Sequence, residues 1–192
     1  MKLRNPEMAC YLVWTIWAAS WWIAAAWSSR TQSSAGVRQQ LPYRLLTIIG
    51  FILIFAVRSR RSPDPLRLWT LPRIASWLMP ILCVVGFAFA WWGRLHLGKL
   101  WSAFVTRKAG HRVIDTGPYA IVRHPIYSGI ILAMFAVAVL KGTVYSMAGA
   151  VIGIFGFWIK ARLEERFLRE QLGAEPYRNY CRGVPMFVPF SK

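Results

Sequence analysis

The chain has 192 residues, of which 56% are hydrophobic, 15% aromatic and only 16% charged. An average soluble domain carries about 25% charged residues, so this composition excludes a disordered chain, a collagen-like chain and a disulfide scaffold. Twenty-four Lys and Arg residues against seven Asp and Glu give a net charge of +17. Because the basic residues flank apolar runs, we expect the lipid bilayer, and not nucleic acid, to be the partner of this charge.

Five apolar stretches follow one another along the chain, and each predicts a membrane helix. They are residues 8–27, 45–57, 75–92, 126–140 and 143–159. A spanning helix takes about 20 residues, so five of them leave no room for a separate large soluble domain. We therefore expect an all-α, polytopic integral membrane protein that is a single domain over 1–192, with N-terminal membrane helices in 1–95 and the last two apolar stretches and a C-terminal tail in 96–192.

Three of the stretches, the second, fourth and fifth, suggest more detail. The last two are separated only by Lys141 and Gly142, which predicts a tight helical hairpin with its turn near the far membrane face. The second stretch can extend back through residues 41–44, with the Arg44 side chain reaching toward the lipid headgroups.

The polar connections set the expected orientation in the membrane. If all five stretches cross it, residues 28–44, 93–125 and 160–192 share one side, which carries 16 of the 24 Lys and Arg residues. Cytoplasmic loops are enriched in these residues, so we expect the C-terminal segment, and any pocket that these connections form, at the cytosolic face. The five arginines of the 58–73 segment fit this orientation badly.

Several conspicuous residues have structural explanations. The eleven tryptophans are explained by anchoring at the membrane interface and by packing, with a groove for an aromatic substrate as the alternative. Cys10 and Cys83 lie in apolar runs and are expected to be packed thiols, and no metal site is expected. Gly149 and Gly153 are spaced for close helix packing.

Polar residues that could take part in binding or catalysis form a first cluster within residues 111–129. Gly117 precedes a proline, which is a turn signal, and Pro125 suits the first position of a helix. Such a helix start offers backbone N–H groups to a carboxylate or phosphate. His124 and Tyr127 are three residues apart and can share a face, while Arg123 and Tyr119 add donors. The alternative is an interfacial belt that only anchors a helix end.

A second cluster follows the predicted hairpin and contains Lys160, Arg162, Glu164 and Glu165. Because the hairpin starts after the first cluster and returns before the second, both are expected at one membrane surface. A carboxylate there could accept hydrogen bonds from ribose hydroxyls or an ammonium group, while Lys160 and Arg162 hold an anionic substrate group. The alternative is a solvated helix with weak local ion pairs.

The combined pattern resembles the isoprenylcysteine carboxyl methyltransferase family and its phospholipid-methyltransferase relatives. The resemblance covers residues 107–190. It rests on the string GPYAIVRHPIYSG from Gly117 to Gly129, the hydrophobic hairpin, the Glu164-Glu165 pair and a tail with Val184-Pro185 and Val188-Pro189.

This resemblance implies S-adenosylmethionine as the methyl donor, bound at the membrane face without a Rossmann domain. By the resemblance, Glu164 contacts the cofactor and Glu165 lies close by. The other residues implied to line the cofactor pocket are His111, Arg112, Val113, Ile114, Tyr119, His124, Pro125 and Tyr127. We expect His124, Tyr127, Lys160 and Arg162 to act in catalysis. Lys160 stands where an arginine linked to the substrate carboxylate is common, and lysine keeps the charge but loses the bidentate fork.

The leading hypothesis is therefore a membrane methyltransferase that methylates the carboxylate of an isoprenylcysteine-like or other lipophilic acceptor, prenylated or lipid. A carboxylate is already ionised at pH 7 and needs no general base, whereas an amine must lose a proton. The alternatives are a phospholipid amine or thiol methyltransferase, a sterol-reductase-like enzyme that uses NADPH, and a non-catalytic membrane or lipid-interaction protein.

Overall fold

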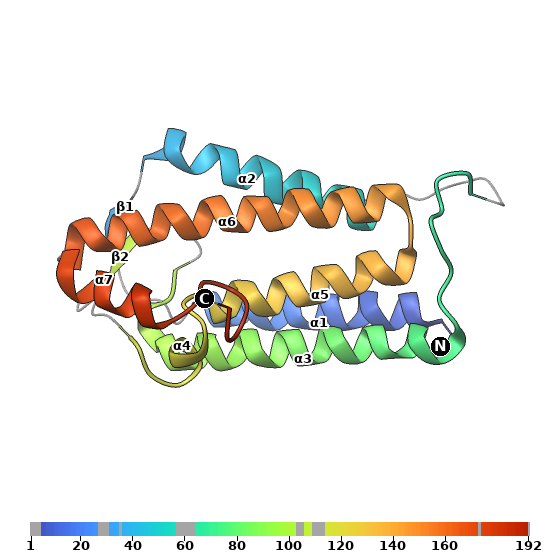
Figure 1. Ribbon diagram of the computed structural model, residues 1–192, viewed down its shortest axis with the longest axis horizontal. Helices are drawn as coiled ribbons and strands as arrows, with labels where there is room; N and C mark the ends of the chain where they lie inside the picture. The colour runs from blue at the N-terminus through green and yellow to red at the C-terminus, as the bar shows by residue number, and fades with distance from the viewer. Residues whose placement is uncertain are drawn as a thin grey trace.

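The computed structural model describes residues 5–26, 31–34, 36–56, 64–102, 106–108, 114–172 and 174–191. Its architecture is a bundle of long helices that run side by side (Figure 1). The long helices are α1 (Pro6–Ala25), α2 (Val37–Phe51), α3 (Arg73–Leu97), α5 (Pro125–Lys141) and α6 (Val144–Leu172). All five apolar stretches are helical, and the predicted all-α, polytopic membrane fold is confirmed.

Within the described residues, four helical segments are long and apolar enough to cross a membrane. They are Pro6–Ala25, Val37–Ala56, Arg73–Leu97 and Val144–Glu170. Helix α5 is apolar but has only 17 residues, so it is shorter than each of these four segments.

The helices extend beyond the apolar stretches that predicted them. Helix α6 continues past Ile159 to Leu172, α3 continues past Trp92 to Leu97, and α2 begins at Val37 and ends in a π-helical turn, η1 (Ile52–Ala56). Lys, Arg and Glu are as good helix formers as Leu. The end of an apolar run therefore marks a membrane boundary and not the end of a helix.

Short elements gather at one end of the bundle. They are β1 (Thr31–Ser34), η2 (Gly98–Leu100), β2 (Thr106–Lys108), α4 (Pro118–Ile121) and α7 (Ala174–Gly183). Strands β1 and β2 pair antiparallel; strands this short carry no alternating pattern, and the sequence did not predict them. The α5–α6 turn and the segment before α3 lie at the opposite end (Figure 1). The three polar connections thus meet at one end, as the spacing of the apolar stretches predicts.

The predicted hairpin turn between α5 and α6 is correct. Gly142 has a left-handed backbone with φ 58° and ψ 34°, a conformation that glycine adopts without strain. Its carbonyl accepts the N–H of Leu68 at 2.7 Å. Lys141 Nζ donates to the Ile54 carbonyl at 2.6 Å, so the hairpin is tied to the π-helical end of α2.

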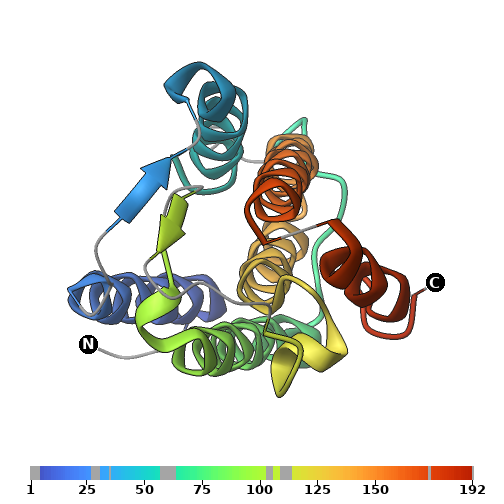
Figure 2. The same ribbon diagram turned by 90° about the vertical axis from the view of Figure 1, so that its left-hand side faces the viewer.

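Viewed along the bundle, α2 lies beside α6, while α5 packs on α3 with α1 at its side (Figure 2). Glycines permit both contacts. A Cβ on Gly50 of α2 would lie 2.8 Å from the backbones of Gly149 and Gly153, which confirms the packing role expected for that pair. A Cβ on Gly129 of α5 would overlap the Gly86 carbonyl oxygen of α3.

Substituting Gly129 with alanine should therefore force α3 and α5 apart. We expect the Gly129→Ala protein to lose about 1–3 kcal/mol of stability, the usual effect of overpacking, and to show a lower thermal transition in detergent. Gly36→Ala is the matched control, because no atom lies within 4 Å of a Cβ at that position. Equal transitions for the two variants would contradict the close approach of α3 and α5.

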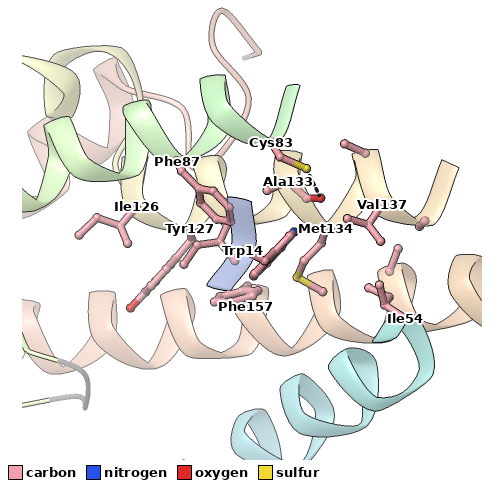
Figure 3. Close-up of a cluster of buried hydrophobic side chains, with 14 of the residues drawn as sticks. Trp14, Ile54, Cys83, Phe87, Ile126, Tyr127, Ala133, Met134, Val137 and Phe157 are labelled. Carbon is pink, nitrogen blue, oxygen red and sulfur yellow. Dashed lines mark hydrogen bonds between the residues drawn. The ribbon is translucent and has the colours of Figure 1, made fainter. Parts of the chain in front are cut away.

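The core between the helices is rich in aromatic side chains (Figure 3). Trp14 of α1 meets Phe87 of α3 edge to face, with ring centroids 4.7 Å apart, and Trp17 stacks on the same ring at 4.5 Å. Cys10 and Cys83 are fully buried beside them, with their Sγ atoms 3.9 Å apart. Packing thus accounts for these tryptophans and for both thiols.

Candidate functional site

The site is built on the connection that leads into α5. Gly117 has φ 59°, and a Cβ there would lie 2.7 Å from the His96 ring, so glycine is required. The chain then forms the single turn of α4 and reaches His124, which immediately precedes α5, with Pro125 at the first helical position. This confirms the predicted helix start and places both residues at the same end of the bundle as the last turns of α6.

His124, Tyr127 and Glu164 form the centre of the site. The His124 and Tyr127 rings are stacked, with centroids 5.4 Å apart and planes 6° apart. Tyr127 points from α5 toward α6 (Figure 3), and its hydroxyl donates to Glu164 Oε1 at 2.5 Å. Glu164 Oε2 lies 3.7 Å from His124 Nδ1. The hairpin thus brings together residues 37 positions apart in the sequence.

The neighbouring Glu165 has a different environment. Its side chain is 1% exposed, compared with 20% for Glu164. Glu165 Oε1 accepts from Arg123 Nε at 2.7 Å and lies 3.2 Å from His124 Nε2. His124 therefore lies between the two carboxylates, and Glu165 fixes it from the buried side.

The C-terminal tail is fastened to the same place. Arg123 Nη1 donates to the carbonyls of Cys181 and Val184, at 2.9 Å and 2.5 Å. The backbone N–H groups of Arg123 and His124 donate to the carbonyls of Pro185 and Met186. The tail thus packs over the start of α5 and shields the ion pair between Arg123 and Glu165.

Lys160 and Arg162 lie on different faces of α6. The Lys160 ammonium is 4.9 Å from the centroid of the Tyr127 ring and 5.6 Å from that of Tyr43, so it adjoins the central cluster. Arg162 is exposed, and its guanidinium lies 5.5 Å from the centroid of the Trp158 ring. The structure brings Lys160 to the cluster and does not bring Arg162 there.

The remaining predicted residues lie at the edge of the cluster or outside the described chain. Tyr119 is buried, with its hydroxyl 3.4 Å from the Gly93 carbonyl. Burial raises the pKa of Tyr119 well above its usual range, so its phenol stays a neutral donor. Ile114 is partly buried at the first position of its described segment. His111, Arg112 and Val113 lie outside the described residues.

The roles of two buried or half-buried arginines were not predicted. Arg123 was expected only as an additional donor in the first cluster, and nothing in the sequence reveals that its partners are Glu165 and the carbonyls of Cys181 and Val184. Arg94 is 1% exposed near the end of α3, donates to the Gly98 and Ala24 carbonyls, and lies over the Trp101 ring at 4.6 Å. Its place directly after an apolar run is the signal that could have revealed it.

The donor set favours an organic ligand with cationic and hydroxyl groups. Glu164 is a reachable carboxylate, the stacked rings give an aromatic surface, and the start of α5 presents the positive end of a helix dipole. In the described part of the chain, no three His, Cys, Asp or Glu side chains are grouped to hold a metal ion.

Comparisons with known proteins agree with this arrangement. The chain is similar to methanethiol S-methyltransferase 2 of Bradyrhizobium diazoefficiens, at 30% identity over 160 residues, which are 79% of this chain and 60% of the relative. It is 32% identical to protein-S-isoprenylcysteine O-methyltransferase B of Arabidopsis thaliana over 87 residues, 45% of this chain and 44% of the relative. It is 39% identical to methanethiol S-methyltransferase of Pseudomonas deceptionensis over 71 residues, 37% of this chain and 26% of the relative.

The chain thus spans 60% or less of the length of each of these relatives. Residues 78–170 match the isoprenylcysteine carboxyl methyltransferase (ICMT) family. They include α5 and most of α6, which carry the central cluster, together with most of α3.

Proposed function

We propose that the protein is an integral membrane methyltransferase that transfers the methyl group of S-adenosylmethionine to a lipophilic acceptor. The observation that supports this most strongly is the carboxylate of Glu164, hydrogen-bonded to Tyr127 and next to His124, at the polar end of a membrane bundle. The family match over residues 78–170 and the methyltransferase names of the relatives support the same reaction.

The residues present fit this cofactor. Its sulfonium and ammonium groups are cationic, and Glu164 with the Tyr127 ring offers a carboxylate and an aromatic face. The start of α5 offers backbone N–H groups for its carboxylate. Tyr119 and Ile114 would contribute to the rim, while Glu165 and Arg123 act as positioning residues that hold His124 in place.

When bound, the cofactor would supply an electrophilic methyl carbon. A carboxylate acceptor would need no general base from the chain, because it is already ionised at pH 7. The chain therefore needs only to orient both reactants and to exclude water. Lys160, one helical turn deeper in the bundle than Glu164, is placed to hold the acceptor's negative charge.

A thiol is the second candidate acceptor. It is favoured by the 30% identity to a methanethiol S-methyltransferase, which extends over 79% of this chain. A thiol attacks as the thiolate, with its proton released to solvent, and an adjacent ammonium group such as Lys160 favours the charged form. Either acceptor would enter from the bilayer, while the water-soluble cofactor would enter at the basic end, which we assign to the cytosol.

The reaction is tested by following a radiolabelled methyl group from S-adenosylmethionine. Purified protein in lipid nanodiscs is offered N-acetyl-S-farnesylcysteine, octanethiol and phosphatidylethanolamine. We expect label in the methyl ester or in the methyl thioether. The absence of label in all three products, from protein that binds the cofactor, would contradict the proposed acceptor classes.

Replacing Lys160 with arginine should improve the use of a carboxylate acceptor. Arginine presents two parallel N–H groups to a carboxylate, whereas lysine acts as a point charge. We expect the Lys160→Arg protein to show a KM for N-acetyl-S-farnesylcysteine lowered by about 3- to 10-fold, corresponding to about 1 kcal/mol, without such a gain for octanethiol. An unchanged ratio between the two acceptors would remove Lys160 from the acceptor site.

A further inference from the structure

A pocket of about 300 Å³ opens between the start of α2 and the last turns of α6. Pockets for small ligands begin at about this size. The residues that line it are Gln39 of α2 and Leu163, Arg166, Phe167 and Glu170 of α6. The four residues of α6 are three or four positions apart, so they share one face of the helix. Adjacent residues point about 100° apart, which turns this face away from the buried Glu165.

The lining combines an apolar floor with both charges. Leu163 is 7% exposed and packs with Tyr43 of α2, with Phe167 partly buried beside them. Arg166 and Glu170 are exposed and lie one helical turn apart, a spacing at which opposite charges can pair. Within the part of the chain that the structure describes, neither takes part in an ion pair. Both charges are therefore available to a ligand.

The pocket lies where α6 leaves the bilayer. The apolar run ends at Ile159, and at about 1.5 Å per residue Leu163 lies about 6 Å beyond it, Arg166 about 10 Å and Glu170 about 16 Å. The headgroup layer of one leaflet is about 5–8 Å thick, so the pocket begins inside this layer and continues at its outer surface. Apolar residue, cation and anion thus follow one another outward, in the order in which a zwitterionic phospholipid carries its chains, phosphate and ammonium group.

We propose that this pocket binds the headgroup of a zwitterionic phospholipid from the surrounding leaflet, with Arg166 at the phosphate and Glu170 and Phe167 at the ammonium group. A guanidinium group can donate two parallel hydrogen bonds to a phosphate. A carboxylate attracts the ammonium group, and an aromatic face adds a cation–π contact. Gln39 offers an amide that can donate and accept.

The bound lipid is distinct from the methyl acceptor. Glu170 lies about 9 Å further along α6 than Glu164, so an ammonium group held there is out of reach of a methyl group bound beside Glu164. The lipid instead fills the space between α2 and α6 at the polar end of the bundle.

The pocket also predicts a selectivity that the net charge does not. A net charge of +17 attracts anionic lipids to the protein surface in general. At the pocket, however, the carboxylate of Glu170 stands next to the guanidinium of Arg166. An anionic lipid can satisfy only Arg166, whereas a zwitterionic lipid satisfies both charges.

The test uses dimyristoyl phosphatidylcholine, whose amine is fully methylated and cannot act as an acceptor. Purified protein in non-ionic detergent is titrated with this lipid, and binding is measured by native mass spectrometry, with dimyristoyl phosphatidylglycerol as the comparison. We expect Arg166→Gln to weaken the binding of phosphatidylcholine about 10-fold, the effect of one lost charge-assisted contact. Glu170→Gln should weaken phosphatidylcholine about 5- to 10-fold without weakening phosphatidylglycerol.

Arg162→Gln is the matched control, because Arg162 is an exposed arginine one turn closer to the membrane but lies over Trp158 and outside the pocket. Its loss should leave the binding of phosphatidylcholine unchanged. Exchanging the two charges, Arg166→Glu together with Glu170→Arg, keeps the net charge and should still abolish the preference. Wild-type binding of phosphatidylcholine by Glu170→Gln or by the exchanged protein would overturn the headgroup site, and so would equal losses in Arg162→Gln and Arg166→Gln.

Discussion

The Glu164→Gln protein is expected to fold normally and to bind S-adenosylhomocysteine about 10- to 100-fold more weakly than wild type. Glutamine keeps the shape of the side chain but removes the charge, and hydrogen bonds to charged groups contribute about 1.5–3 kcal/mol. Glu164 is 20% exposed and contacts Tyr127 and His124, so a ligand can reach it. Titration calorimetry in detergent measures the change.

Arg162→Gln is the control for this experiment. Arg162 lies on the same helix two residues away, but its side chain is exposed and lies over Trp158. Its loss should leave the affinity for S-adenosylhomocysteine unchanged. If Glu164→Gln binds as tightly as Arg162→Gln, Glu164 is not part of the cofactor site.

The Glu165→Gln substitution should mainly lower the stability of the protein, and only secondarily affect ligand binding. Glu165 is 1% exposed and pairs with Arg123, which is itself 11% exposed. Removing one partner of a buried ion pair leaves the other charge uncompensated and typically costs about 3–5 kcal/mol. We expect the thermal transition in detergent to fall by roughly 10 °C, with earlier proteolysis of the C-terminal tail that Arg123 holds.

Two further variants test whether this effect comes from the ion pair. Arg169 also contacts Glu165, at 3.5 Å, but it is 45% exposed, so Arg169→Gln should change stability by less than about 1 kcal/mol. Once Glu165 is glutamine, the additional change Arg123→Gln should cost much less than it does alone. Fully additive effects of the two substitutions would show that Arg123 and Glu165 are not energetically coupled.

The helices and the meeting of the two polar clusters could be predicted because they depend on local pattern and chain connectivity. Apolar runs of membrane length identify the helices, and the two-residue turn at Lys141 and Gly142 requires α5 and α6 to be antiparallel neighbours. His124 and Glu164 therefore meet at one end of the bundle, as predicted. The predicted helix ends were less accurate, because the polar residues of α6 continue the helix as readily as the apolar residues do.

The sequence could not predict that Glu165 is buried in an ion pair while Glu164 stays accessible. Adjacent residues on a helix point about 100° apart, so only the positions of α5 and of the tail decide which carboxylate is buried. The contact between Tyr43 and Lys160 was equally hidden, since it depends on how α2 lies against α6. Gly50 of α2 and Gly153 of α6 allow this close approach. Because they are about 100 residues apart, the sequence around each glycine does not reveal that the other is its partner.

The central claim is most directly tested by titrating the purified, detergent-solubilised protein with S-adenosylhomocysteine, using NADPH as the comparison. We expect saturable binding of S-adenosylhomocysteine that is weakened in Glu164→Gln and retained in Arg162→Gln, with no binding of NADPH. Binding of NADPH alone would contradict the methyltransferase assignment and favour a sterol-reductase-like enzyme. Binding of neither ligand to folded protein would contradict a cofactor site at His124, Tyr127 and Glu164.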